Sequence, residues 1–133
     1  MNAKNAKLRF ENLERALARL QEALAAPSDT PFVVDASIQR FEFAFELCWK
    51  TMRGFLELEM SGASLGTARE VLKAAYAAHW VDDEGGWIDL LNMRNTTSHV
   101  YNEAMARDIY KRIGKAMPLL LAVLPVLRVK AQA

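Results

Sequence analysis

Residues 30–60 read TPFVVDASIQRFEFAFELCWKTMRGFLELEM, and this stretch decides the fold class. Apolar side chains recur in it at spacings of three and four, which is the period of an α-helix. They are Ile38, Phe41, Phe45, Trp49, Met52 and Leu56. Thr30 followed by Pro31 is a typical N-cap and first-turn pair. The stretch therefore predicts a long amphipathic helix from Thr30 to about Met60.

Two further stretches on either side of it show helical signals. In the N-terminal one, leucines recur at the same spacings, and the helix is expected to end near Pro27. These leucines are Leu13, Leu17, Leu20 and Leu24. Farther along, Thr67 and Glu70 fit a capping box directly before apolar positions, which predicts a third helix from Thr67 to near His79.

The remaining third of the chain predicts a short helix and a long one. The composition of Asp82–Gly86 is typical of a solvated turn, and Trp87–Arg94 has the pattern of a short helix. Asn95–Ser98 are poor helix formers, so a stop is expected there. Asn102 is a good cap for a last helix, which Pro118 is expected to bend. Its apolar positions are Met105, Ile109, Ile113, Met117, Leu120 and Leu124.

Length and composition indicate one all-α domain over residues 1–133. A chain of 133 residues with 52% apolar side chains can fill one core. The three long and two short helices, with brief connections, predict an up-and-down bundle of four to five helices. Phe43 and Phe55 lie off the main stripe of their helix. If they are exposed in one copy, a partner chain is their natural cover, so we expect a homodimer or a heteromeric complex.

Charge and cysteine content indicate where such a chain functions. The 17 basic and 16 acidic residues nearly balance, so contact with RNA or phosphate requires a local patch. The single cysteine, Cys48, lies in an apolar stretch and is expected to be a reduced core residue, which favours the cytoplasm. The first twenty residues lack the continuous apolar stretch of a signal peptide. The longest apolar run, Pro118–Leu127, is too short to span a membrane.

Several chemistries lack their signature in this sequence. A di-metal bundle site needs a glutamate three residues before a histidine, but Tyr76 precedes His79 and Thr96 precedes His99 at that spacing. Glycine-rich phosphate loops are also absent from the sequence. We therefore expect no metal and no bound cofactor.

Residues 94–101, Arg-Asn-Thr-Thr-Ser-His-Val-Tyr, form the densest polar set in the chain. Arginine binds phosphate oxygens in a bidentate manner, and histidine exchanges protons near neutral pH. On an unbroken helix Arg94 and His99 would point about 140° apart, so they converge only if the helix stops or two chains meet. His99 and Tyr101 share a side if the backbone is extended. In the alternative interpretation, the hydroxyls bond local backbone at a helix end and Arg94 pairs with an acidic neighbour.

Two segments resemble a known family. The pattern Arg94-x-x-x-x-His99-x-Tyr101, with Asn95 after the arginine, is similar to the motif of HEPN-domain proteins. Residues 37–50, SIQRFEFAFELCWK, resemble the second helix of the HepT-like branch of that superfamily, the nucleotidyltransferase substrate-binding proteins. The two segments occur in the family's order, and the resemblance covers about residues 8–127.

The resemblance implies a dimeric helical bundle with a small nucleotidyltransferase as partner. It implies a metal-independent RNase toxin with Arg94 and His99 as catalytic residues, inhibited when the transferase adds AMP to Tyr101. Asn95 and Glu46 are expected to support the site. Arg40, Glu42, Glu46 and Lys50 either line the cleft or brace the bundle, and helical spacing does not decide between these.

Two other functions stay open at this stage. The chain is alternatively a binding subunit that holds a nucleotide or RNA for the transferase without chemistry of its own. A structural helical adaptor would need only the apolar stripes. Arg107, Lys111 and Lys115 recur every four residues on the last helix and are either an RNA-guiding row or an ordinary solvated face.

Overall fold

The computed structural model describes residues 3–61 and 64–133, and within these it is helical with no strand. The helices are α1 (Ala3–Ala25), α2 (Pro31–Glu59), α3 (Ala68–Ala77), α4 (Glu84–Thr96) and α5 (Glu103–Gln132), with a 3₁₀ turn, η1 (Thr97–His99), after α4. The all-α prediction and the five helices are thereby confirmed. No helix in these residues is both long and apolar enough to cross a membrane.

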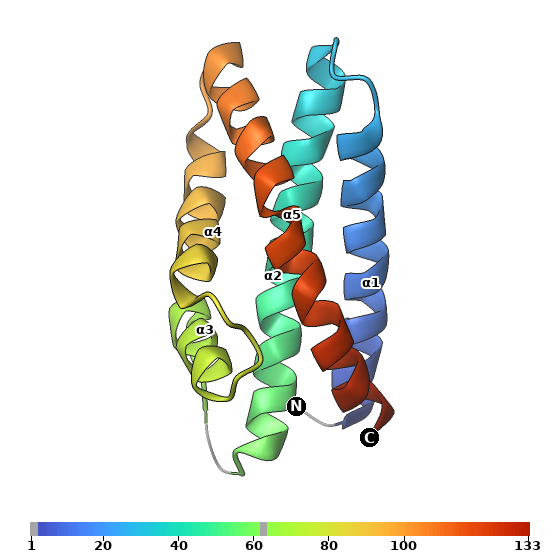
Figure 1. Ribbon diagram of the computed structural model, residues 1–133, viewed down its shortest axis with the longest axis vertical. Coiled ribbons are helices and arrows are strands. Elements are labelled where there is room, and N and C mark those ends of the chain that lie inside the picture. Colours follow the sequence, from blue (N-terminus) through green and yellow to red (C-terminus); the bar gives the residue numbers. More distant parts are fainter. Residues whose placement is uncertain (1–2, 62–63) are drawn as a thin grey trace.

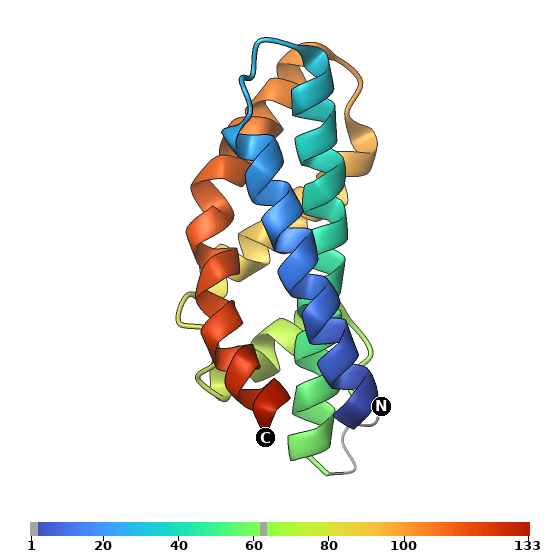
Figure 2. The same cartoon turned by 90° about the vertical axis from the view of Figure 1, so that its right-hand side faces the viewer.

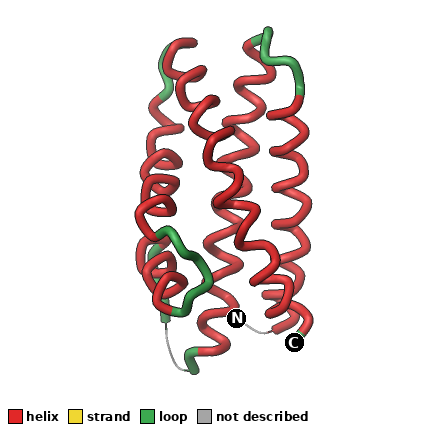
Figure 3. The backbone as a smooth tube through the Cα atoms, in the orientation of Figure 1, coloured by secondary structure: helices red, strands yellow, loops and turns green. Residues whose placement is uncertain are grey.

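The arrangement is an up-and-down bundle in which two short helices share one position. α1, α2 and α5 run the length of the molecule, while α3 and α4 follow each other along the remaining side (Figure 1). The view turned by 90° shows α1 crossing beside α2, with both chain ends at one end of the bundle (Figure 2). Short connections link most of these elements (Figure 3). The end of α4, with η1, lies at the end of the bundle opposite to the termini.

The core is built along α2, as its apolar period predicts. Phe41, Phe45, Cys48 and Met52 are fully buried and meet the leucines of α1 and the apolar face of α5. Full burial of an aromatic side chain contributes about 2 to 3 kcal/mol, so Phe41 and Phe45 are among the larger single contributors to the stability of the bundle. Phe43 is exposed, but Phe55 is 5% exposed and belongs to the core, so the expectation of two uncovered aromatics holds only for Phe43.

The caps explain where the helices begin. The side chains of Thr67, Asp83 and Asn102 accept hydrogen bonds from the backbone N–H three residues on, which satisfies first-turn donors of α3, α4 and α5. The threonine half of the predicted capping box is confirmed, while the Glu70 carboxylate accepts from the Thr67 hydroxyl at 3.0 Å. Thr30 precedes α2 with Pro31 in the first turn but makes no side-chain cap bond.

The prediction of a turn over Asp82–Gly86 is wrong, because α4 already begins at Glu84. Asp83 caps the helix by accepting a hydrogen bond of 2.8 Å from Gly86 N–H. A Cβ at Gly86 would lie 2.5 Å from Asp83 Oδ2 and 2.9 Å from Leu119 Cδ1. Glycine is needed there for close approach of cap and helix, although composition alone made it a turn signal.

The last helix matches its prediction at Ile109, Ile113, Met117 and Leu120, which are buried, and differs toward its two ends. α5 continues through Pro118 and Pro125, and its buried face includes Ala106, Val123 and Leu127. Met105, predicted to be core, is 39% exposed. The apolar pattern of a long helix admits two neighbouring stripes, and packing selects between them.

Candidate functional site

Arg94 is fixed by two carboxylates of α2. It lies in the last turn of α4, where its Nη1 is 3.2 Å from Glu42 Oε2 and its Nε is 3.4 Å from Glu46 Oε1. All three side chains are between a quarter and roughly a third exposed. The prediction that Glu46 supports the site is consistent with this contact, and Lys50 extends the cluster with its Nζ 3.7 Å from Glu46 Oε2. The four charges sum to zero.

The nitrogens of Arg94 have unequal environments. Nε is buried, and its contact with Glu46 lacks hydrogen-bond geometry. Nη1 contacts Glu42 and donates to Thr97 Oγ1 at 3.3 Å. Nη2 has no recorded partner among the described residues and is not one of their buried unpaired atoms. This nitrogen is therefore the part of the guanidinium left without a protein partner in the described residues.

Thr97, which sequence analysis did not single out, connects α4 to α2. Its buried hydroxyl lies 3.0 Å from Glu42 Oε2 and 2.7 Å from the Arg94 carbonyl oxygen. A hydroxyl has one proton, so it donates to one of these two acceptors at a time while accepting from Arg94. The signal in the sequence was weak, because threonine beyond a helix end ordinarily bonds only its own backbone.

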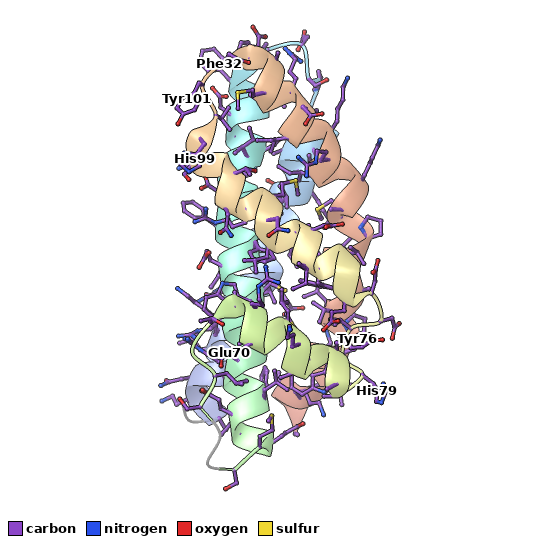
Figure 4. All side chains as sticks on the ribbon, turned by 90° about the vertical axis from the view of Figure 1, so that its left-hand side faces the viewer. Phe32, Glu70, Tyr76, His79, His99 and Tyr101 are labelled. Atoms are coloured by element: carbon purple, nitrogen blue, oxygen red, sulfur yellow. The ribbon has the colours of Figure 1, made fainter. Side chains whose placement is uncertain are left out.

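His99 and Tyr101 form a second, exposed part of the site. His99 ends η1, and Val100 follows it with extended backbone, φ −90° and ψ 113°. The two side chains therefore share one side, as predicted, with His99 Nδ1 3.3 Å from Tyr101 Oη. Tyr101 is 79% exposed. Figure 4 shows His99 and Tyr101 toward one end of the bundle.

Within one chain, the arginine and the histidine stay in separate contacts. The helix does stop between them, at Thr96, but Arg94 contacts Glu42, Glu46 and Thr97, whereas His99 contacts Tyr101. The hydroxyls of Thr96, Thr97 and Ser98 bond the carbonyls three residues back. The local-backbone interpretation thus describes the single chain. Asn95 contributes its carbonyl to Ser98, and its exposed side chain makes no recorded bond in the described part.

The other charged residues predicted to take part in the site either hold helices together or are exposed to solvent. Arg40 donates to the Arg19 carbonyl and pairs with Glu22, so it braces α1 against α2. Arg107 contacts Glu103 and the Ser28 carbonyl. Lys111 and Lys115 are exposed. The predicted basic row therefore loses Arg107 to a structural contact.

Two other candidates carry little chemistry. The described residues 3–61 and 64–133 contain no group of three histidine, cysteine or acidic side chains placed to hold a metal ion. Burial raises the pKa of the Cys48 thiol to about 12, which suppresses the thiolate form that a nucleophile needs. Cys48 is a core residue, as predicted.

The fold and the site define a class of protein: an up-and-down helical bundle that carries an arginine in the last turn of its fourth helix and a histidine and a tyrosine just beyond it. The chain belongs to the family described as "Nucleotidyltransferase substrate binding protein like", whose profile matches residues 8–124. This confirms the resemblance carried by residues 37–50 and 94–101.

Individual relatives agree. A Haemophilus influenzae protein described as a probable ribonuclease HepT is 28% identical over 121 residues, covering 80% of this chain and 83% of its own. A crystal structure from Thermus thermophilus superposes with a TM-score of 0.79 at 33% identity, covering 87% and 98% of the two chains. A second structure, from Haemophilus influenzae and described as revealing the fold of a substrate-binding domain of a nucleotidyltransferase, has a TM-score of 0.67 at 25% identity, covering 96% of this chain and 99% of its own.

Proposed function

We propose that this protein is the companion of a small nucleotidyltransferase and that it cleaves RNA without a metal ion, as a toxin that its partner inhibits. The observation that carries the proposal is the His99–Tyr101 pair on an exposed loop, one helical turn beyond a preorganised arginine. The family description supports the partner, and the ribonuclease description of the Haemophilus influenzae relative supports the reaction.

The reaction uses the ribose 2′-hydroxyl as nucleophile. A base removes its proton, the 2′-oxygen attacks phosphorus, and the 5′-oxygen leaves with a proton from an acid, which gives a 2′,3′-cyclic phosphate. Positive charge stabilises the phosphorane, and Arg94 Nη2 is free to supply it. One chain offers a single histidine at this site. In a symmetric dimer, two His99 side chains supply base and acid.

The dimer has a testable surface. Phe43, on α2 one position from Glu42, is 59% exposed, and Phe32 on the same helix is 83% exposed. Burial of these rings between two copies would remove apolar area from water. It would also bring the His99–Tyr101 segments of the two copies near each other. Sedimentation at micromolar concentration should give a dimer, and Phe43→Asp should give a monomer that does not cleave RNA. A monomeric unaltered chain that cleaves RNA would refute the shared site.

Inhibition follows from the position of Tyr101. Its exposed hydroxyl can attack the α-phosphorus of ATP on the transferase, forming a tyrosyl–AMP ester and releasing pyrophosphate. The added phosphate then lies beside His99, where the scissile phosphate would bind, so inhibition requires no conformational change.

The experiment combines mass spectrometry with cleavage. The purified chain is treated with its neighbouring transferase and ATP, and RNA cleavage is followed before and after. We expect an AMP adduct on Tyr101 and loss of cleavage, while Tyr101→Phe stays unmodified and active. Tyr110, a partly exposed tyrosine outside the site, is the matched control, because Tyr110→Phe should be modified and inhibited like the unaltered chain.

A second function is favoured by one observation. Glu42 and Glu46 offset the charge of Arg94, which weakens its ability to stabilise a phosphorane, so the site suits a subunit that holds its ligand without chemistry. A binding subunit of the transferase would bind nucleotide or RNA without turnover. If the chain with chelator present binds RNA but leaves it intact, this second function replaces the first.

A further inference from the structure

Two hollows lie in line between α4 and α5, beginning at His99. The first has a volume of about 510 Å³ and is lined by His99, Thr96, Met105, Ile109, Asp108 and Arg112 among others. The second, of about 430 Å³, has Met93, Asp89, Lys115 and Leu119 in its wall. Arg112 lines both, so the two hollows meet at its side chain. We call them together the α4–α5 groove.

The lining alternates between apolar and hydrogen-bonding groups. Met105 and Ile109 are the larger apolar side chains that line the first hollow, and Met105 is 39% exposed. Thr96 and Asp108 lie at the same hollow and offer oxygen atoms. Each hollow falls within the range of about 300 to 1,000 Å³ typical of ligand sites. A nucleobase, with apolar faces and a polar edge, matches this lining.

Arg112 stands where a phosphate between two nucleotides would lie. Its only recorded ion pair in the described residues is with Asp108, 3.9 Å away, and the side chains are 51% and 70% exposed. Such an exposed pair contributes little, so a phosphate can replace Asp108 as the partner of the guanidinium. Lys115 provides a second cation at the next hollow.

The charge of the groove limits how its occupant binds. Arg112 and Lys115 are balanced by Asp89 and Asp108, so bulk attraction of a polyanion is weak. Affinity must come from base contacts, including hydrogen bonds of the two carboxylates to base amino groups. A protein partner has a better binding surface on α2. The most exposed aromatic rings on a helix, Phe32 and Phe43, belong to α2 and do not line the groove.

We propose that the α4–α5 groove holds a single strand of RNA, with one base beside His99, a phosphate on Arg112 and the next nucleotide beside Lys115. The proposal rests on the ribonuclease function for the role of His99, but it concerns binding and is tested separately. It identifies Arg112, Met105 and Lys115 as substrate-binding residues. Among the cations of the predicted basic row, it retains Lys115 and assigns no role to Lys111.

The test is binding of a fluorescent 2′-O-methyl RNA strand, which lacks the nucleophile and is not cut. We expect Arg112→Gln and Lys115→Gln each to weaken binding about five-fold, and Ala104→Phe, which fills the first hollow, to weaken it about ten-fold. Lys111→Gln, on the same helix but outside both hollows, should change it less than about two-fold. The logarithmic salt slope should fall by about 0.7 for each lost phosphate contact.

The outcomes separate this proposal from the ribonuclease function. Equal losses for Lys111→Gln and Lys115→Gln, or unchanged RNA binding with loss of transferase binding, would refute the groove as an RNA site. Cleavage of native RNA by the unaltered chain, measured in parallel, reports on the ribonuclease function alone. Binding that follows the groove variants without any cleavage would uphold the groove and refute the reaction.

Discussion

The two histidines of this chain each follow the C-terminus of a helix, and they illustrate two different uses of the same residue. His79 has a left-handed backbone, φ 63°, at the end of α3. Its N–H donates to the Tyr76 carbonyl at 3.0 Å, and Trp80 N–H donates to the Ala75 carbonyl at 2.9 Å, which is the Schellman pattern. His99 follows α4 with ordinary backbone, and its ring contacts Tyr101.

The two histidines differ in which part of the residue matters, the backbone conformation at His79 and the side chain at His99. At His79 the conformation matters, and its exposed ring makes no recorded side-chain bond in the described part of the chain. At His99 the ring lies beside a tyrosine, a cavity and, one turn back, a fixed arginine. Figure 4 shows the two rings far apart along the bundle. Variants at each end should therefore change different quantities.

The largest change in stability is expected for Arg94→Ala. It removes the partner of two part-buried carboxylates, and since all three groups keep some solvent, the free energy of unfolding should fall by about 1 to 2 kcal/mol. Urea denaturation measures it. Arg128→Ala, which breaks the more exposed pair with Glu14, is the control and should cost less than about 0.5 kcal/mol. Equal costs would show that Arg94 is not specially fixed.

Thr97→Val should cost about 1 kcal/mol, because it removes the buried hydroxyl between Glu42 and Arg94 while keeping the side-chain volume. Thr51→Val is the matched control. Thr51 is buried even more completely but bonds only the Leu47 carbonyl, in its own helix, so its loss should be smaller. Thermal unfolding of both variants, together with RNA cleavage, tests this. A loss for Thr51→Val as large as for Thr97→Val would remove Thr97 from the site.

His79→Gly should raise the free energy of unfolding by about 0.5 to 1 kcal/mol, because glycine adopts φ above zero without strain. Cleavage activity should not change. Ala78→Gly is the control, since Ala78 has φ −84° and gains nothing from glycine, so that variant should lose stability. Destabilisation by His79→Gly would mean that the His79 ring has a structural role after all.

The smallest change in stability is expected at His99, where His99→Ala should stay within about 0.5 kcal/mol of the unaltered chain. Its ring is exposed, and its contact with Tyr101 is local. A much larger loss, measured by urea denaturation, would make His99 a structural residue like those of the core.

Sequence periodicity was sufficient for the helices but not for their contacts. The stripe of α2, apart from the half-buried Trp49, and the Thr67 and Asn102 caps are local signals, and the structure confirms them. Gly86 was misinterpreted because its need for close approach to Leu119 arises only in the folded bundle. Phe55 lies off the main apolar stripe of α2, so the sequence did not place it in the core. It is buried by contacts with other parts of the bundle.

The site was predictable in part for the same reason. His99 and Tyr101 are two residues apart, so an extended backbone was enough to pair them. Glu42 reaches Arg94 and Thr97 across more than fifty residues of sequence, and only packing of α4 on α2 reveals this. Arg112, which we propose as a phosphate ligand, gave no signal in the sequence, because a lone arginine has no pattern until two hollows meet at it.

The most direct measurement is RNA cleavage by three chains, unaltered, His79→Ala and His99→Ala, with chelator present throughout and with product ends identified by mass spectrometry. We expect the unaltered chain and His79→Ala to produce 2′,3′-cyclic phosphate ends at similar rates. The cleavage rate of His99→Ala should be at least about a hundred-fold lower. Equal cleavage by His99→Ala and the unaltered chain, or no cleavage by any of the three, would contradict the account.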